Sequence, residues 1–492
     1  MHAARSVTAA LVAVIAALAL IGQFRMPLTS DVAFHLDAAR RMLDGAALYR
    51  DVSAPETPFV FWASVPAAVV GGSGGFAGTV FRCMVVALVL AVLALLWPVT
   101  RAAPVLRAGY VLMALVLPVW YFGTPEHLAF VLLLPYVALA VARLEGEAGS
   151  TGLAVASGAL AAAGVALEPA LGIVPLALLP LEAWLARSAR VVSAPEHAAL
   201  GAALLAASAV VVMAVPDFLE TVPGLRRAWR AVPRPPIGAL LTRDIHVWVV
   251  WFALGAALVF GRTVARQRRI AVLAAATVAG LAAALMQRTG EGPGFFPAAA
   301  FGVMLLLALA TGAPIGRAKL VALRRVSAAL LLVPLLYLFG AVTWRRAHGV
   351  FTRTRAEQLV VMRLLGGAPR DIAVLSADLA DAYPGTLEQG HRFVPRYPSL
   401  WAALLPAAHP MRATMRRHYG DDLRARPPQV IVVRAPRCAE LRPREPAVDY
   451  LALLCRDEVA RQILSRYRFA ERAGGFELYR TDAEGAAACV SS

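Results

Sequence analysis

Charged residues are scarce in this sequence. Asp, Glu, Lys and Arg together make up 16% of its 492 residues, whereas soluble domains carry about 25%. Hydrophobic residues account for 59%, and the mean hydropathy is +0.66. A soluble core has no room for this much apolar surface. The composition therefore excludes an ordinary soluble protein and predicts a polytopic membrane protein.

Lysine is nearly absent, since Lys319 is the only one, yet the formal net charge is +17. The arginines stand in short clusters between apolar runs and do not form one basic face, and no nucleic-acid-binding module is present. We therefore exclude nucleic acid as a partner. The clusters are typical of the cytoplasmic loops of a membrane protein.

Several catalytic and transport signatures are also missing. The sequence has no Gly-rich phosphate loop ending in Lys-Ser or Lys-Thr, no helix with paired zinc-binding histidines and no serine nucleophile elbow. It lacks the internal repeats that are common in transporters. The four cysteines have no metal-binding spacing. Whether Cys438 and Cys455 form a disulfide stays open at this point, and such a bridge would leave Cys489 unpaired.

About eleven apolar runs are long enough to cross a membrane as helices. They cover approximately residues 7–24, 80–98, 108–123, 127–142, 152–167, 169–186, 198–215, 246–261, 270–286, 296–311 and 327–344. A cleaved signal peptide is the alternative for the first run, but its length and the lack of a cleavage site before Thr29 favour a retained helix. A cytoplasmic N-terminus puts most arginine clusters in inner loops, and an odd number of spans then places the tail outside.

The tail differs in composition from the rest of the chain. From about residue 350 it is charged and Pro-rich, with short β-type runs at 372–376, 429–434 and 475–480 and a helical stretch at 451–466. We expect an all-α polytopic membrane region with about 11 transmembrane helices over residues 1–345, including a first outer loop at 25–79. A soluble, extracytoplasmic α/β domain follows over residues 346–492.

The first outer loop is unusually rich in ionisable groups. Thr29 and Ser30 are good N-caps and Gly45 is a natural stop, so a helix is predicted between them. Asp31 and His35 are four residues apart and share one face of this helix. The alternative roles are a first-turn acid that complements the helix dipole for Asp31 and a packing residue for His35. The other charged residues of this helix are predicted to form an ordinary solvated face. They are Asp37, Arg40, Arg41 and Asp44.

The order of several short motifs carries a family resemblance. Asp31…Ala38-Ala39…Gly45…Tyr49-Arg50-Asp51…Pro58, then Gly71 and Arg82, resembles the first loop of GT-C-fold membrane glycosyltransferases. It is similar in particular to bacterial relatives of the protein-mannosyltransferase and aminoarabinose-transferase group, which are like glycosyltransferase family 39. Further matches follow in the expected order: Gly123-Thr-Pro-Glu126-His127-Leu128, Leu134-Pro135-Tyr136, Pro216-Asp217-Phe218, Gln287…Gly294-Phe295-Phe296-Pro297-Ala298 and Arg396-Tyr397-Pro398-Ser399-Leu400-Trp401.

The resemblance also has departures. Glu168-Pro169 stands where the subgroup often has Lys-Pro, and Gly290-Glu291 and Phe295-Phe296 replace a Lys-Gly and a Tyr-His pair. Such positions contact substrate in the subgroup, so the identity of the sugar does not carry over to this chain. Tyr397 and Trp401 are either sugar-stacking or structural aromatics.

The resemblance implies a GT-C-like enzyme of the bacterial inner membrane. It would move a hexosyl or pentosyl group from a polyprenyl-phosphate donor to a glycan, lipid or protein acceptor on the outer face. Such enzymes use an acid of the first outer loop as general base, which by position is Asp31, with Glu126 and Asp51 as further catalytic candidates. Because a phosphate leaves readily, we expect direct displacement with inversion and no covalent intermediate. Asp31, Asp51 and Glu126 are candidate ligands of Mg²⁺ or Mn²⁺ if they converge.

The remaining site candidates are polar residues near the predicted outer ends of the helices. Those expected to contact the substrate are His35, Tyr49, Arg50, Glu56, Arg82, His127 and Arg288. Arg50, Arg82 and Arg288 are the expected phosphate-binding cations, and Arg226, Arg227 and Arg230 form an alternative set. A helix-end acid is the alternative for Glu126, and arginines that reach the interface are the alternative for the cations.

Two other functions fit the sequence less well. The first is a transporter or flippase of lipid-linked sugars, and the second is a non-enzymatic envelope assembly protein that contacts membrane lipid and a partner. The acids gather in one outer loop and not at mid-membrane, which argues against a transporter, and in an assembly protein these acids would be only structural.

Overall fold

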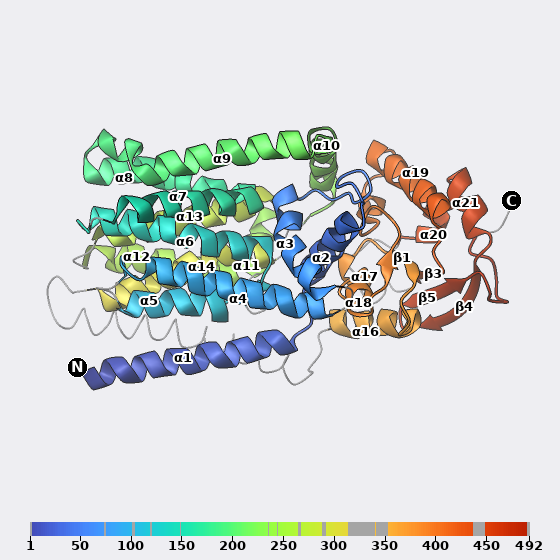
Figure 1. The fold of residues 1–492 in the computed structure, drawn as a ribbon, viewed down its shortest axis with the longest axis horizontal. Helices are drawn as coiled ribbons and strands as arrows, with labels where there is room; N and C mark the ends of the chain where they lie inside the picture. The colour runs from blue at the N-terminus through green and yellow to red at the C-terminus, as the bar shows by residue number, and fades with distance from the viewer. Residues whose placement is uncertain are drawn as a thin grey trace. The chain divides into compact units, whose positions relative to one another are not determined.

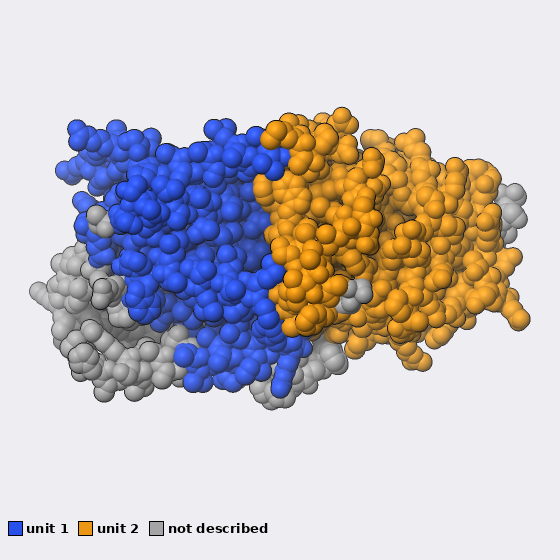
Figure 2. Space-filling view, in the orientation of Figure 1, with its two compact units in different colours: residues 1–26, 82–210, 234–349 blue, residues 27–81, 211–233, 350–492 orange. Residues whose placement is uncertain are grey.

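The structure is a computed structural model that describes residues 2–72, 75–100, 104–118, 121–147, 149–234, 236–243, 245–263, 267–287, 292–312, 340, 353–435 and 448–489. The chain forms two compact units (Figure 2). Unit 1 comprises residues 1–26, 82–210 and 234–349, and unit 2 comprises residues 27–81, 211–233 and 350–492. Most of the first loop therefore belongs to the same unit as the C-terminal region.

Unit 1 is helical in its described residues (Figure 1). Its elements are α1 (His2–Arg25), α4 (Phe76–Leu96), α5 (Pro104–Val111), η1 (Leu112–Val116), α6 (Pro125–Leu144), α7 (Thr151–Leu167), η3 (Pro169–Gly172), α8 (Ile173–Ala186), η4 (Ala189–Ser193), α9 (Pro195–Ala214), α11 (Ile237–Arg243), α12 (Ile245–Phe260), η5 (Gly261–Thr263), α13 (Gln267–Gln287) and α14 (Gly292–Thr311). Two of the boundaries between the two units fall within helices, in α4 and in α9.

The described helices agree with six of the eleven predicted membrane spans, whereas the apolar helix described within the predicted span 108–123 covers only Arg107–Val116. Six are long and apolar enough to cross a membrane, and α1 together with α2 (Ser30–Leu43) counts as a seventh if the pair is one span. The six spans are Phe76–Leu96, Pro125–Leu144, Pro169–Ala186, Pro195–Ala214, Gln267–Gln287 and Pro293–Thr311. The apolar helices α7 and α12 are shorter, and the predicted span 327–344 lies outside the described residues. The chain is a multi-pass membrane protein, and a total of about eleven spans stays a prediction.

Burial distinguishes central from peripheral spans in unit 1. In the spanning window of α6, 94% of the residues are buried, compared with 6% in α9. The side chains exposed on α9 include Leu205 and Met213, so this apolar surface is suited to contact with lipid. α13 packs closely on α14, where a Cβ on Gly280 would lie 3.0 Å from the Ala298 backbone. The lack of a side chain at Gly280 therefore lets the two backbones approach.

Unit 2 combines helices with a small sheet. Its helices are α2, α3 (Pro58–Gly71), α10 (Asp217–Ala231), α16 (Arg353–Leu365), α17 (Leu379–Ala382), α18 (Gly385–Glu388), η6 (Trp401–Leu404), α19 (Pro410–Ala425), α20 (Tyr450–Leu454) and α21 (Glu458–Leu464). Its strands are β1 (Asp371–Leu375), β2 (Arg392–Phe393), β3 (Val430–Arg434), β4 (Arg468–Ala473) and β5 (Phe476–Arg480). The predicted α/β character of the C-terminal region is therefore confirmed.

The sheet has the strand order β2-β1-β3-β5-β4. β1 pairs in parallel with both β2 and β3, while β5 pairs antiparallel with β3 and β4. β3 is an uninterrupted apolar run from Val430 to Val433 and is buried throughout, as expected for a central strand. The main core of the unit includes Ile431 and Val433 of this strand, together with Tyr419 of α19 and Leu225 of α10.

A disulfide joins Cys455 to Cys489, with a Cα–Cα distance of 6.0 Å. The alternative pairing of Cys438 with Cys455 is therefore wrong, and Cys438 itself lies outside the described residues. The reason is long-range backbone pairing, since the Ala488 amide donates to the Tyr467 carbonyl and holds the terminal segment beside the start of β4. Cys489 is thereby brought to Cys455, directly after α20.

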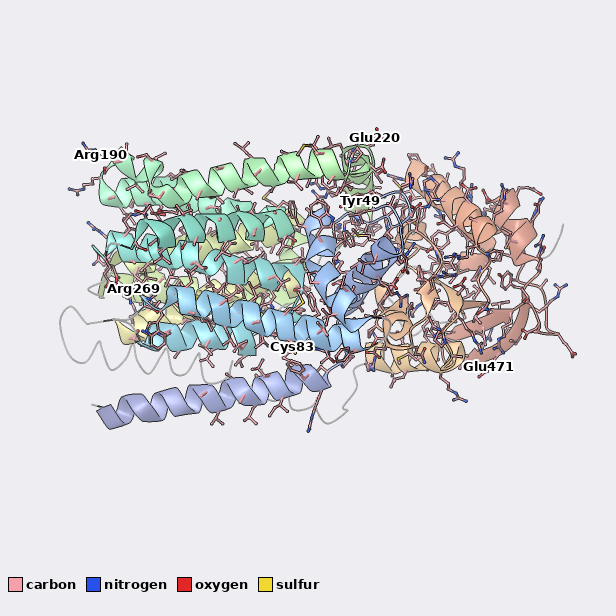
Figure 3. The ribbon with its side chains drawn as sticks, in the orientation of Figure 1. Tyr49, Cys83, Arg190, Glu220, Arg269 and Glu471 are labelled. Carbon is pink, nitrogen blue, oxygen red and sulfur yellow. A yellow bond between two sulfur atoms is a disulfide. The ribbon has the colours of Figure 1, made fainter. Side chains whose placement is uncertain are left out.

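The disulfide predicts a stability effect. A Cys489→Ser variant is expected to lose about 2–4 kcal/mol of unfolding free energy in unit 2, because the bridge closes a chain loop in the unfolded state. Hydrogen exchange of the full-length protein in β4 and β5 measures this loss. Cys83→Ser is the matched control, since Cys83 is an exposed free cysteine (Figure 3). Equal protection in both variants would contradict a stabilising role for the bridge.

Candidate active site

Asp31 lies in the first turn of α2, where the Thr29 side chain caps the helix by accepting a hydrogen bond from the Val32 amide at 3.2 Å. The Asp31 side chain is partly buried, and no hydrogen bond or ion pair joins it to another described residue. Burial is the main cause that raises the pKa of Asp31 to about 6, and the Asp378 carboxylate adds to the shift. Asp31 therefore has the properties of a proton acceptor near neutral pH.

Asp31 lies near the carboxyl end of β1, because its helix α2 packs against α17, the short helix that Asp378 caps. Asp378 follows β1 by three residues and caps α17, where its side chain accepts a hydrogen bond from the Ala380 amide at 2.9 Å. β1 and β3 are parallel neighbours in the sheet. The chain continues from β1 to β2 on one side and from β3 toward β4 and β5 on the other, so a topological switch point lies between β1 and β3. The carboxyl ends of strands at such points are where open α/β sheets usually bind ligands.

A buried ion pair stands at the same strand ends. Arg434 ends β3 and donates hydrogen bonds to both carboxylate oxygens of Asp381, and it also pairs with Glu357 at 3.2 Å. The Ser376 hydroxyl, which follows β1, donates to the same Asp381 carboxylate. Burial and the Asp378 charge raise the pKa of Asp381 to about 6 despite Arg434. This pair fixes the strand ends beside which Asp31 and Asp378 lie.

The predicted solvated face of α2 is wrong for Asp37 and Arg41, whereas Asp44 is exposed as predicted. Asp37 is fully buried, and it accepts hydrogen bonds from Arg40 at 2.7 Å and from the Tyr383 hydroxyl at 2.8 Å. Arg41 is also buried and donates to the carbonyl oxygens of Pro395 and Asp51. This face of α2 instead contacts the C-terminal region, which the helix alone does not reveal.

His35 lies inside unit 2, among aromatic rings. Its ring centroid is 5.7 Å from that of Phe34 and 5.4 Å from that of Phe61. Burial lowers the pKa of His35 to about 3, so the imidazole is neutral at physiological pH. Its Nε2 atom has no hydrogen-bond partner among the described residues. In this state His35 packs against aromatic rings and retains one unused polar atom.

The loop after α2 is anchored by Tyr49, which Figure 3 labels. This residue has a positive φ of 71°, its side chain is buried, and its hydroxyl donates to the Glu56 carbonyl at 2.8 Å. Arg50 is exposed, and among the described residues it forms a single ion pair, with Asp51 at 3.6 Å. The Asp51 carboxylate accepts a hydrogen bond from the Ala47 amide at 2.8 Å. The buried Tyr49 thus presents Arg50 to solvent.

One arginine of the alternative cationic set contacts this loop. The Arg226 guanidinium, on α10, donates to the Pro55 carbonyl at 2.8 Å. The Phe218 ring, also on α10, has its centroid 5.4 Å from that of Tyr49. The outer helix α10 therefore shapes the loop, and Arg226 serves at least as a structural donor.

The other predicted site residues belong to unit 1. Glu126 is half-buried in the first turn of α6. His127 is fully buried, with Nδ1 accepting from the Gly123 amide at 2.9 Å and Nε2 within 2.8 Å of the Ala114 carbonyl. Both of its nitrogens thus have backbone partners, which leaves none for a substrate in this arrangement. Arg82 is buried and donates to the Met26 carbonyl. Arg288 lies outside the described residues.

The expected metal ligands Asp31, Asp51 and Glu126 do not form one group among the described residues. Three residues that were not predicted, Glu182, Glu196 and His197, do place one ligand atom each within 4.8 Å of one another.

Sequence reasoning also missed Asp378, Asp381 and Arg434. Their signal was nevertheless present, because Asp378 follows the predicted strand 372–376 and Arg434 ends the predicted strand 429–434. Carboxyl ends of neighbouring parallel strands meet at one edge of a sheet. Only the parallel pairing of β1 with β3, which the sequence did not predict, makes this signal usable.

Two features define the fold class of this chain. Unit 1 is an apolar helical unit, and in unit 2 the first loop packs with an α/β sheet. The fold agrees with the GT-C fold that the resemblance implied.

One solved structure supports this fold. The chain is similar to ArnT from Cupriavidus metallidurans bound to undecaprenyl phosphate, with a TM-score of 0.57, 13% identity and coverage of 99% of both chains. The Archaeoglobus fulgidus oligosaccharyltransferase is also similar. Tethered with an acceptor peptide, it has a TM-score of 0.47, 10% identity and coverage of 97% of this chain and 74% of that one. In the apo form the values are 0.47, 11%, 97% and 75%. No family model matches the chain, and no curated protein matches it by sequence.

Proposed function

We propose that this protein is an inverting membrane glycosyltransferase that transfers a sugar from a polyprenyl-phosphate donor to an envelope glycan, lipid or protein. The observation that carries the proposal is the placement of Asp31. A carboxylate without a hydrogen-bond partner among the described residues, with a raised pKa, stands at the start of the first-loop helix beside the carboxyl end of β1. The likeness to ArnT along 99% of the chain supplies the matching fold.

In this proposal Asp31 is the general base. An acceptor hydroxyl is a poor nucleophile until a carboxylate takes its proton, and a positioned base contributes a rate factor of about 10²–10⁴. The sugar C1–phosphate bond breaks as the acceptor oxygen attacks C1 from the opposite face, so the configuration inverts and the lipid phosphate leaves. Neutral His35 is suited to a hydrogen bond with an uncharged hydroxyl through Nε2.

The leaving phosphate needs a cation. Of the three expected cations, the structure describes Arg50 and Arg82, and Arg50 has the exposed guanidinium, with 68% of its side chain accessible. Arg82 is buried and hydrogen-bonded to Met26. We therefore assign the donor phosphate to Arg50, next to the buried anchor Tyr49. Glu126 and Asp51 remain the alternative acids.

Two features support the proposed cellular location. The disulfide between Cys455 and Cys489 supports an extracytoplasmic C-terminal region, because disulfides persist in oxidising compartments. Arg190 and Arg269 both lie at one end of the helices of unit 1 (Figure 3), as expected for the cytoplasmic side. We therefore place the protein in the bacterial inner membrane with the C-terminal region on the outer side.

The test is sugar transfer by the purified protein in nanodiscs. It is supplied with a panel of polyprenyl-phosphate sugars and a crude envelope fraction as acceptor. Release of polyprenyl phosphate together with labelled acceptor supports the proposal. Movement of the lipid-linked sugar across a vesicle membrane without transfer would replace the proposal with a flippase.

The raised pKa of Asp31 predicts a pH dependence. A protonated Asp31 accepts no proton, so kcat/KM is expected to fall about tenfold for each pH unit below about 6 and to level off above it. Asp378→Asn removes a negative charge that raises this pKa, so the fall is expected to begin at a lower pH. Asn preserves the α17 cap. A pH profile of wild type, Asp378→Asn and the exposed control Asp44→Asn measures this. An unchanged midpoint in Asp378→Asn would assign the titration to another group.

A further inference from the structure

A second cluster of ionisable side chains is buried in unit 1, apart from the residues assigned to transfer. Arg143 ends α6, Glu182 is near the end of α8, and Glu196 and His197 are in the first turn of α9. The two glutamates are 0% and 2% exposed. The η4 turn that connects α8 to α9 carries Arg190, which Figure 3 labels at an end of this unit.

Each of the three side chains that could bind a metal has one atom that contacts Arg143 or Tyr136 and another that has no partner, and neither oxygen of Glu182 has a hydrogen bond to a described residue. Arg143 forms ion pairs with Oε2 of Glu182 at 3.6 Å and with Oε1 of Glu196. Tyr136 is hydrogen-bonded through its hydroxyl to Nδ1 of His197 at 2.9 Å. The atoms that remain without a hydrogen bond to any described residue include Oε1 of Glu182, Oε2 of Glu196 and Nε2 of His197.

The charges and the packing both favour a further cation. Two buried carboxylates face one guanidinium, which leaves one negative charge uncompensated if both carboxylates are ionised. α7 also holds the start of α9 close, since a Cβ on Gly158 would lie 2.1 Å from the Glu196 carbonyl oxygen. The cluster is therefore held within packed helices and does not lie on a solvated surface.

We propose that Glu182, Glu196 and His197 bind a divalent transition-metal ion such as Zn²⁺ or Mn²⁺. Two carboxylate oxygens and one imidazole nitrogen are a ligand set that suits these ions, and they leave a position for water. Their ligand atoms lie within 4.8 Å of one another. Two atoms that are each about 2.1 Å from one ion are at most about 4.2 Å apart. The largest distance between two ligand atoms therefore has to shorten by less than about 1 Å when the ion binds.

Arg143 and Tyr136 then orient the ligands through the atoms that do not contact the metal. Metal sites commonly hold their ligands by such outer partners. Because α8 and α9 supply the ligands, the ion joins the two ends of the η4 connection. It acts on the fold of unit 1, and the proposal does not depend on sugar transfer.

The test is metal uptake by the full-length protein in detergent. Chelator-stripped protein is dialysed against Zn²⁺ or Mn²⁺ and its metal content is measured by mass spectrometry. Wild type is expected to take up about one ion per chain, and Glu182→Gln and His197→Ala to lose at least about tenfold in affinity. The exposed control Glu220→Gln is expected to bind as wild type does.

Tyr136→Phe keeps the ring and removes only the hydroxyl that contacts His197, so it serves if the other variants do not fold. The Tyr136→Phe variant is expected to bind the metal about 10-fold or more weakly than wild type. The thermal midpoint of the wild-type protein is expected to rise when Zn²⁺ is added. Stripped wild type that takes up neither ion would overturn the proposal, as would uptake that Glu182→Gln, His197→Ala and Tyr136→Phe all leave unchanged.

Discussion

Replacing Asp31 by Asn is expected to lower sugar transfer by about two orders of magnitude or more. The Asn side chain has nearly the same shape but accepts no proton from the acceptor hydroxyl. The variant is expected to melt no lower than wild type, because the ionised Asp31 carboxylate is disfavoured by its burial and by Asp378. The measurement is single-turnover transfer with saturating donor, together with a thermal melt of each protein.

Two other carboxylates give this experiment its controls. Asp44 is exposed at the C-terminal end of the same helix, so Asp44→Asn is expected to retain full activity. Asp37 is buried and hydrogen-bonded to Arg40 and Tyr383. The Asp37→Asn variant is therefore expected to lower the melting temperature, whereas the transfer rate of the folded protein does not depend on Asp37 as a base. Equal transfer by wild type and a well-folded Asp31→Asn variant would remove Asp31 from the mechanism and point to Glu126 or Asp51.

The second large effect concerns stability. Arg434→Ala is expected to lower the unfolding free energy of unit 2 by about 3–5 kcal/mol, because it leaves the Asp381 carboxylate buried without its cation. Hydrogen exchange in β1 and β3 of the full-length protein measures the loss. These strands supply the central parallel pair of the sheet.

A double variant separates the ion pair from simple packing. Arg434→Met with Asp381→Leu removes both charges and is expected to recover much of the loss. Arg472→Ala breaks an exposed pair with Glu477 at the surface of the sheet and is expected to cost about 0–1 kcal/mol. A loss in Arg434→Ala as small as that in Arg472→Ala would show that the buried pair contributes little.

Much of the fold was predictable because it depends on local patterns. Apolar runs of spanning length follow from the need to satisfy backbone hydrogen bonds in lipid, and the described helices lie where those runs are. The three β-type runs of the tail became β1, β3 and β5. β2 and β4 were missed, since Arg392–Phe393 is too short to show a pattern and β4 has the exposed charged pair Glu471 and Arg472 in its middle.

The interior of unit 2 was less predictable. His35 and Asp31 are both on α2, yet His35 became a neutral residue among aromatic rings, while Asp31 acquired a raised pKa. Sequence spacing placed them on one face but did not indicate what that face contacts. The same limit explains the error over Asp37 and Arg41. Their charges suggested that they face solvent, but their hydrogen-bond partners Tyr383 and Pro395 lie far along the chain.

The sequence by itself determined the membrane class, most helix positions, the α/β nature of the tail and the GT-C resemblance. These depend on hydropathy, on capping residues and on the order of short motifs, all of which are local. Only the tertiary structure decided that most of the first loop belongs with the C-terminal region, that Cys455 pairs with Cys489 and that Glu182, Glu196 and His197 converge. Each of these rests on contacts between segments distant in the chain, such as the 346-residue separation between Asp37 and Tyr383, and no local pattern encodes them.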